Sequence, residues 1–105
     1  MSDTQKALSA LGLCVRAGKV IFGVPQVTEA MRRGGKTRPV AVFEACDTSE
    51  NTHKRITDKC TYYHIRQIRL EADGATLAAA LGKSAHLAAV AVTDADMCRM
   101  VEQYL

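Results

Sequence analysis

Residues 22–38, FGVPQVTEAMRRGGKTR, decide how the elements around them are ordered. Pro25 predicts a helix start, because proline is favoured at the first helical position, where its missing N–H would be unpaired in any case. Apolar residues then recur at helical spacing, and the Gly-Gly pair at 34–35 ends a helix that we place at residues 24–33. A short extended piece precedes this helix and an apolar run follows it. The stretch therefore predicts a helix between two strands.

The rest of the chain repeats this alternation. Further helices are predicted at residues 4–17, from a cap among residues 47–49 to about Tyr63, at 76–81 and from Asp94 onward, and strands at 19–22, 39–43, 65–70 and 87–92. Glu50 follows Asp47 by three residues, as in a capping box. Strands that alternate with helices are typical of a sheet covered on both faces. We therefore predict an α/β protein with a single domain over residues 1–105, folded as a three-layer α/β/α sandwich around a four-stranded mixed sheet.

The composition argues against several classes of protein. Hydrophobic residues make up 48% of the 105, which is too many for a disordered chain. No apolar run approaches the roughly 18 residues of a membrane-spanning helix, and the first ten residues do not resemble a signal peptide. Four cysteines without a CxxC pair and three histidines at unsuitable spacings predict reduced thiols and no metal site. We expect a cytoplasmic protein, monomeric when free, with no cofactor and no membrane contact.

The net charge of +3 is unevenly distributed along the chain. Residues 1–38 hold seven Lys and Arg against two acids, whereas residues 71–105 hold two against five. A basic N-terminal third favours an anionic partner, with nucleic acid as the first candidate. A charged surface that serves only solubility is the alternative that charge alone leaves open.

Residues 30–37, AMRRGGKT, match a relaxed Walker A motif with alanine in place of the first glycine. That motif binds phosphates only when a strand precedes the loop and a helix follows it. Here a helix leads into the loop and a strand leaves it, so nucleotide hydrolysis is disfavoured. The cations Arg32, Arg33, Lys36 and Arg38 suit phosphate contacts instead, although cations at a helix end also complement the helix dipole.

Two further pairs of residues bear on function. Glu44 and Asp47 follow an apolar strand, where active sites often occur, but no nucleophile or base is spaced to act with them. We therefore predict that the protein is not an enzyme. Tyr62 and Tyr63 fall on the third helix, away from the basic segments, and we expect Tyr63 in the core.

The order of several motifs resembles a known family. The motifs are RAGK at 16–19, the glycine before the second helix, SENT at 49–52 with ITDKC at 56–60, and AVTD at 91–94. Together they are similar to the ribosomal-protein family that binds kink-turn RNA, and within it to the small bacterial YlxQ-type members. The resemblance extends from Leu8 to Met97. It implies a non-catalytic α/β/α protein in which RNA meets the start of the second helix and the loop before the last strand.

The resemblance and the basic residues together indicate an RNA-binding surface made of these two segments and neighbouring cations. The candidate residues are Lys19, Gly23, Val24, Pro25, Gln26, Glu29, Arg33, Lys36, Lys83, Ser84 and His86. We expect structured RNA as the partner, with ribosomal RNA as the first candidate. Ribosomal proteins and translation factors are candidate protein partners.

Three of these residues depart from the pattern of the family. Its kink-turn readers carry an asparagine, a glutamate and a lysine where this chain has Pro25, Gln26 and Glu29. Gln26 keeps an amide that can hydrogen-bond a base edge, whereas Glu29 places an anion where a cation would meet phosphate. These departures motivate an alternative, a protein-interaction module that keeps the fold without reading a kink-turn.

Overall fold

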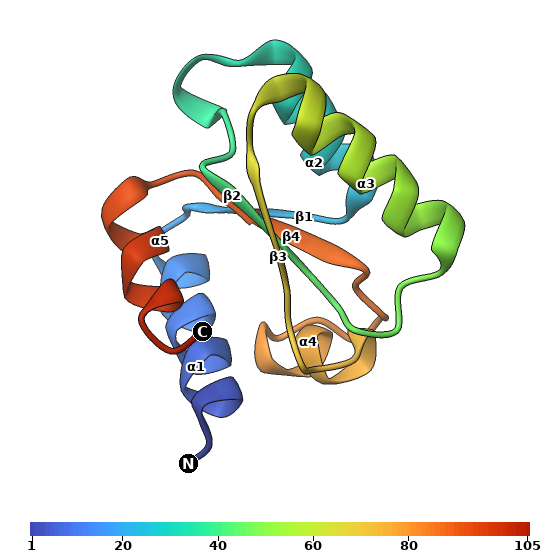
Figure 1. The fold of residues 1–105 in the computed structure, drawn as a ribbon. Coiled ribbons are helices and arrows are strands. Elements are labelled where there is room, and N and C mark those ends of the chain that lie inside the picture. Colours follow the sequence, from blue (N-terminus) through green and yellow to red (C-terminus); the bar gives the residue numbers. More distant parts are fainter.

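Four short strands form one mixed sheet in a computed structural model that describes all residues 1–105 (Figure 1). The strand order is β1-β4-β2-β3, with β1 and β2 antiparallel to β4 and β3 parallel to β2. The elements are α1 (Asp3–Arg16), β1 (Val20–Phe22), α2 (Val24–Arg33), the 3₁₀ turn η1 (Gly35–Thr37), β2 (Ala41–Glu44), α3 (Glu50–Tyr63), β3 (Arg66–Arg69), α4 (Gly74–Ala80), β4 (Ala89–Val92) and α5 (Ala95–Glu102). The predicted α/β alternation and mixed four-stranded sheet are confirmed.

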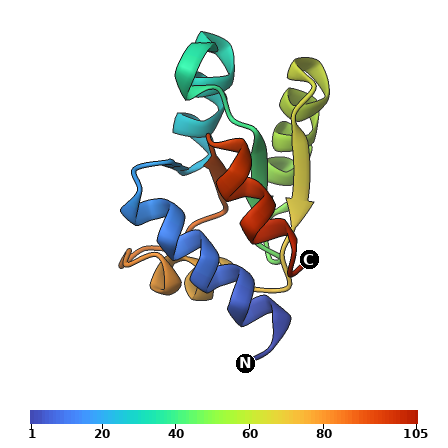
Figure 2. The ribbon, with the colours of Figure 1, turned by 90° about the vertical axis from the view of Figure 1, so that its left-hand side faces the viewer.

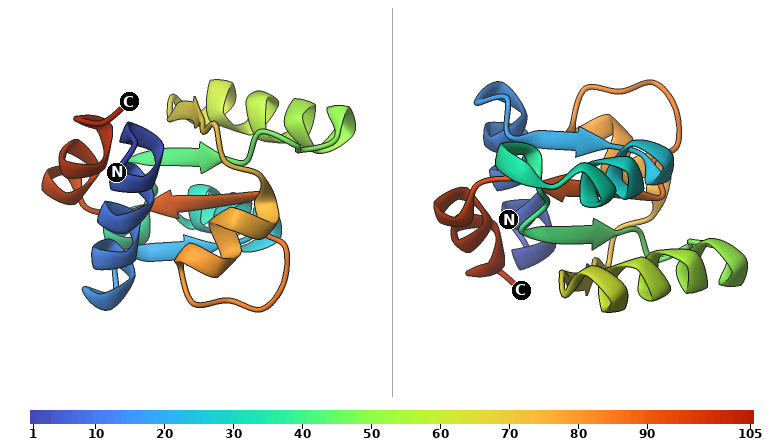
Figure 3. Two further views of the ribbon diagram at one scale, coloured as in Figure 1. Left: turned by 90° about the horizontal axis from the view of Figure 1, so that it is seen from below. Right: turned by 90° about the horizontal axis from the view of Figure 1, so that it is seen from above.

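Helices cover both faces of this sheet. Helices α1, α4 and α5 lie on one face, and α2 and α3 lie on the other. In Figure 2, α2 and α3 form the upper part of the molecule, and Figure 3 shows the two faces from below and from above. Because successive side chains of a strand point to opposite faces, β2 sends Phe43 into the larger core and Val42 into the smaller one. Strand β4 divides its side chains in the same way, with Val90 in the larger core and Ala91 in the smaller.

The end of α1 follows the predicted glycine signal. Gly18 has a φ of 72°, and the next amide, Lys19 N–H, donates to the Cys14 carbonyl at 3.0 Å. This pattern is a Schellman motif, which satisfies carbonyl groups that the end of a helix leaves unpaired. No helix of the protein combines the length and hydropathy needed to cross a bilayer.

The cap of α3 is one of the predicted candidates, but its predicted capping box and the predicted start of α4 differ from the structure. Helix α3 is capped by Ser49, whose hydroxyl accepts the Thr52 N–H, so the predicted capping box of Asp47 with Glu50 does not form. Helix α4 begins two residues earlier than predicted, because the Asp73 carboxylate accepts the Thr76 N–H. In both places the side chain that lies closest to the first turn serves as the cap, and Asp47 is left free for a contact elsewhere.

The end of α3 generates a stability prediction. His64 occupies the left-handed position after the helix with a φ of 58°, and Ile65 N–H donates to the Cys60 carbonyl at 2.8 Å. A side chain with a Cβ is strained there and glycine is not, so His64→Gly should raise the free energy of unfolding by up to about 1 kcal/mol. Urea denaturation of the two proteins measures the difference.

The matched control is Gly18→Ala at the equivalent position after α1, where an added Cβ would meet no atom within 4 Å. This change introduces the strain that the first one removes, and it should lower the free energy of unfolding by about 1 kcal/mol. A lower urea midpoint for His64→Gly than for the unchanged protein would contradict the prediction.

Candidate functional site

The two segments predicted to form the site lie side by side at one end of the sheet. The Gly23 N–H donates to the Ala89 carbonyl at 3.0 Å and so carries the β1–β4 pairing one step past Phe22. This bond places the first turn of α2 against the end of the loop that leads into β4. From the same loop, the Lys83 ammonium lies 4.3 Å from the centroid of the Phe22 ring, a cation–π contact. The structure thus brings together the start of α2 and the Lys83 loop.

The first turn of α2 has few free backbone donors. Gly23, the N-cap residue with a φ of 83°, has no side chain to cap the helix, and its own N–H is already bonded to Ala89. Pro25 has no N–H. Of the four residues 23–26, only Val24 and Gln26 therefore have amides left at the positive end of the helix dipole. The Val24 side chain is buried and that of Gln26 is exposed.

Glu29, one turn further along α2, does not stand as an isolated anion. Its carboxylate accepts hydrogen bonds from the Arg32 guanidinium at two atoms, Nη2 at 2.5 Å and Nε at 3.0 Å. The hydrogen bond from Arg32 is the main reason why the pKa of Glu29 lies below its ordinary value. The negative charge expected to repel a phosphate is therefore balanced on the same helix face.

The base of the Lys83 loop is fixed by a small polar cluster around Gly74. Asp47 accepts the Gly74 N–H at 2.9 Å through one oxygen and contacts His86 Nε2 at 3.3 Å through the other. The Leu87 N–H donates to the Gly74 carbonyl at 3.1 Å. The imidazole of His86 packs directly on Gly74, because a Cβ built there would come within 2.1 Å of Nε2. His86 thus positions the loop, while Lys83 and Ser84 are exposed on it.

Three predicted cations lie at the opposite end of the sheet. The Lys19 carbonyl accepts the Thr93 N–H at 3.0 Å, beyond the last residue of β4, so Lys19 lies where β1 begins. Arg33 is the last residue of α2, and Lys36 lies in η1. Helix α2 runs back over the sheet (Figure 1) for ten residues, or about 15 Å, and so separates Arg33 and Lys36 from its own start, whereas the length of β1 separates Lys19 from Gly23. The structure therefore does not bring these three candidate cations together with the start of α2 and the Lys83 loop.

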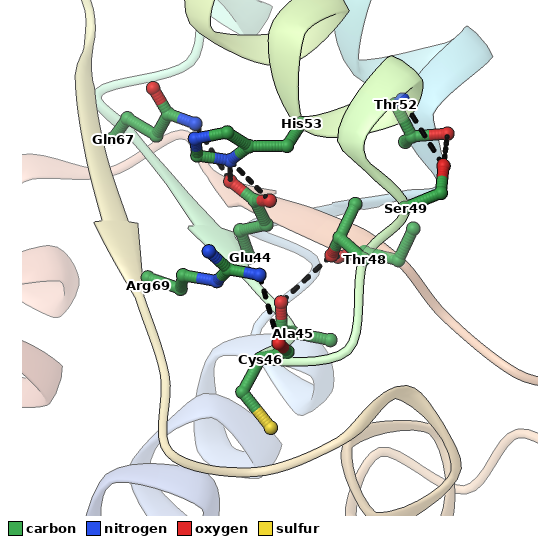
Figure 4. Close-up of polar contacts among 10 residues, drawn as sticks. Glu44, Ala45, Cys46, Thr48, Ser49, Thr52, His53, Gln67 and Arg69 are labelled. Carbon is green, nitrogen blue, oxygen red and sulfur yellow. Dashed lines mark hydrogen bonds and ion pairs between the residues drawn. The ribbon is translucent and has the colours of Figure 1, made fainter.

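A buried carboxylate at the end of β2 has partners that the sequence did not reveal. Glu44 has no exposed surface, and its oxygens lie 2.7 Å from His53 Nδ1 and 2.7 Å from Gln67 Nε2, which donates to it (Figure 4). The statement that no base is placed to act with Glu44 is therefore wrong. A carboxylate at an inward-facing position of an apolar strand was the available signal, since a buried charge requires partners.

This carboxylate–imidazole pair is not joined to a nucleophile. The nearby Ser49 hydroxyl is bonded to Thr52 at 3.0 Å, and Figure 4 shows Ser49 to one side of the Glu44–His53 pair, next to Thr52. The pair therefore compensates a buried charge.

The four cysteines are free thiols, and burial raises the pKa of Cys60 to about 11. No group of three His, Cys, Asp or Glu side chains is placed to hold a metal ion.

Comparison with known proteins gives related chains. A model of the Ribosomal protein L7Ae/L30e/S12e/Gadd45 family matches residues 5–101. A protein named RNA-binding protein YlxQ from Bacillus subtilis (strain 168) is 40% identical over 84 residues, which cover 80% of this chain and 79% of that protein. A protein of the same name from Enterococcus faecium is 44% identical over 63 residues. That match covers 60% of this chain and 58% of the Enterococcus protein, less than two thirds of its length.

Solved structures show the same fold. A Bacillus halodurans C protein of unknown function superimposes with a TM-score of 0.82 at 30% identity, over 94% of this chain and 95% of that one. The Giardia lamblia 15.5kD RNA binding protein superimposes with a TM-score of 0.74 at 12% identity, over 94% of this chain and 81% of that one. At 12% identity the second likeness concerns the fold alone.

The cluster at the base of the Lys83 loop generates a prediction about pH. The Gly74 amide, and after it His86, hold the pKa of Asp47 below its ordinary value. Such a carboxyl stabilises the fold above its unfolded pKa, near 4, and loses that contribution as the pH falls through the folded value. The free energy of unfolding should therefore fall less between about pH 7 and about pH 2.5 in Asp47→Asn than in the unchanged protein.

Urea denaturation at the two pH values measures this difference. The matched control is Asp58→Asn on α3, because the Asp58 carboxylate makes no hydrogen bond or ion pair. That variant should show the pH dependence of the unchanged protein. An unaltered pH dependence in Asp47→Asn would contradict the role given to the cluster.

Proposed function

Because the chain belongs to the Ribosomal protein L7Ae/L30e/S12e/Gadd45 family, we propose that it binds structured RNA in the cytoplasm, with ribosomal RNA as the first candidate. The relatives from Bacillus subtilis and Enterococcus faecium carry the name RNA-binding protein YlxQ, and we infer that this chain likewise binds RNA and is not an enzyme. The observation that carries the proposal is the junction at which the Gly23–Ala89 hydrogen bond holds the start of α2 beside the Lys83 loop.

The junction has the chemistry to hold one turn of an RNA backbone. The amides of Val24 and Gln26 lie at a helix N-terminus, where hydrogen-bond donors and the helix dipole both favour a phosphate. Gly23 has no Cβ, so a backbone can approach closely at this point. Lys83 adds a flexible cation from the opposite side, and the exposed Gln26 side chain provides both a donor and an acceptor for a base edge.

The cations at the far end of α2 have a different part in this proposal. Lys19, Arg33 and Lys36 are exposed and make no ion pair. Arg33 lies about 15 Å along α2 from the junction, so these cations reach only an RNA that continues toward the other end of the sheet. Contacts of this kind raise affinity and its dependence on salt without reading sequence.

A binding series tests the junction. Lys83→Met removes the charge but keeps an unbranched side chain over Phe22, and Gln26→Ala removes the polar group at the helix start. In filter binding to a folded hairpin, Lys83→Met should weaken binding and reduce the slope of log affinity against log salt by about one. Two RNAs are compared, a kink-turn hairpin and the same hairpin with a fully paired stem. If the unchanged protein prefers the kink-turn hairpin and Gln26→Ala loses this preference, base reading is assigned to Gln26.

The control for charge is Lys6→Met on α1, which removes one exposed cation from the opposite face of the sheet. It should bind as the unchanged protein does. Equal losses in Lys6→Met and Lys83→Met would show that only net charge matters, and the junction would then have no special role. If the unchanged protein retains no folded RNA even at low salt, the proposal fails and the protein-interaction alternative gains support.

A further inference from the structure

The outward face of α3 carries the largest open groove of the surface, about 680 Å³ in volume. Every residue that lines it belongs to this helix: Asn51, Lys54, Arg55, Asp58, Lys59, Tyr62 and Tyr63. Asn51, Arg55, Asp58 and Tyr62 fall at helical spacing on one stripe, on the side of the helix opposite the buried Ile56 and Cys60. Long polar side chains and one aromatic ring therefore project together into solvent, on a helix that the junction does not include.

The cations of this face are not neutralised by the protein. Lys54, Arg55 and Lys59 make no ion pair, although Asp58 shares their helix face. The neighbouring arginines are engaged elsewhere, Arg32 with Glu29 and Arg66 with Glu102. The face thus holds three cations against one anion and carries a net charge of about +2, which suits an anionic partner.

A charged face that serves only solubility does not explain the exposed ring of Tyr62. Its side chain is 74% exposed, more than that of any other aromatic residue of the protein. Tyr63 meets it edge to face, with ring centroids 4.8 Å apart and an interplanar angle of 84°. The Tyr63 ring is partly buried against the smaller core, and the Arg38 guanidinium donates to the Tyr63 carbonyl at 2.7 Å. Tyr62 is therefore a supported ring with most of its surface in water.

We propose that this face of α3 is a second RNA contact that holds an unpaired segment of the RNA bound at the junction. A base of that segment stacks on Tyr62, and Lys54, Arg55 and Lys59 contact its phosphates. Exposed aromatic rings among cations bind single-stranded nucleic acid in this way. A protein partner suits the face less well, because protein interfaces have an apolar centre and this face has one ring among charges.

The path from the junction to this face is continuous along one end of the sheet. Glu44 pairs with Ala89 across β2 and β4, and Ala89 accepts the Gly23 N–H, so β2 ends beside the junction. Helix α3 starts from the loop that follows β2, and its N-terminus lies at that same end of the molecule (Figure 3). An RNA strand that leaves the junction meets the first turn of α3 and reaches Tyr62 after roughly 16 Å along the helix.

The inference rests on the proposed function, and one experiment separates the two. Affinity is measured by fluorescence anisotropy for a folded hairpin and for the same hairpin with a short unpaired uridine extension. The unchanged protein should bind the extended RNA about tenfold more tightly than the hairpin alone. Tyr62→Ala should lose that gain while it binds the hairpin alone as before, and Tyr62→Phe should keep the gain.

Variants of the cations and of the junction complete the test. Lys54→Gln with Lys59→Gln should lower the gain and its salt dependence, and Lys83→Met should weaken both RNAs by the same factor. Tyr62 is exposed, so its loss should leave the circular dichroism spectrum and the urea midpoint unchanged. An extension that brings no gain, or a gain that Tyr62→Ala retains, overturns the inference and leaves the junction intact. Binding of neither RNA overturns both, and binding of an acidic peptide alone would assign the face to a protein.

Discussion

Strand β4 is hydrogen-bonded on both edges and buried on both faces, and the other layers of the protein are arranged around it. Antiparallel pairing with β1 on one side and β2 on the other fixes which chain ends meet at each end of the sheet. The bond from the Gly23 N–H to the Ala89 carbonyl is the last step of the first ladder. Segments that are more than sixty residues apart in the chain thereby meet at the candidate site.

The alternation of helices and strands was predictable because it depends on local signals. Continuous apolar runs, Pro25 at a helix start and Gly18 at a helix end each act within a few residues. The strand order was not predictable, since adjacent runs give no information about which edges pair. The cap of α3 shows the same limit, because Asp47 could close its own helix or reach Gly74, and only the folded chain selects the second.

The candidate site also combines features that the sequence predicted with features that only the folded chain shows. The resemblance pointed to the start of α2 and the loop before β4, and the structure brings these segments together. Lys19 is separated from them because it lies at the other end of β1, and Arg33 and Lys36 are separated because α2 returns over the sheet. The contacts of His86 with Asp47 and of His53 with Glu44 link residues that are 39 and nine positions apart. No local pattern encodes such pairs, although a carboxylate in an apolar strand signals that a partner exists.

Pro25, Gln26 and Glu29, the three departures from the family pattern, affect the kinds of group available at the start of α2 more than the net charge there. Pro25 removes one amide, the ladder bond to Ala89 uses another, and the pairing of Glu29 with Arg32 cancels one negative charge. In the proposed function, two amides, one glutamine side chain and one exposed lysine are then left to hold RNA at the junction. Few fixed donors together with exposed cations elsewhere favour binding that depends on phosphate positions and on salt more than on base identity. Such a protein gains selectivity by joining separate weak contacts through the shape of one RNA, since each added contact becomes intramolecular once the first has formed.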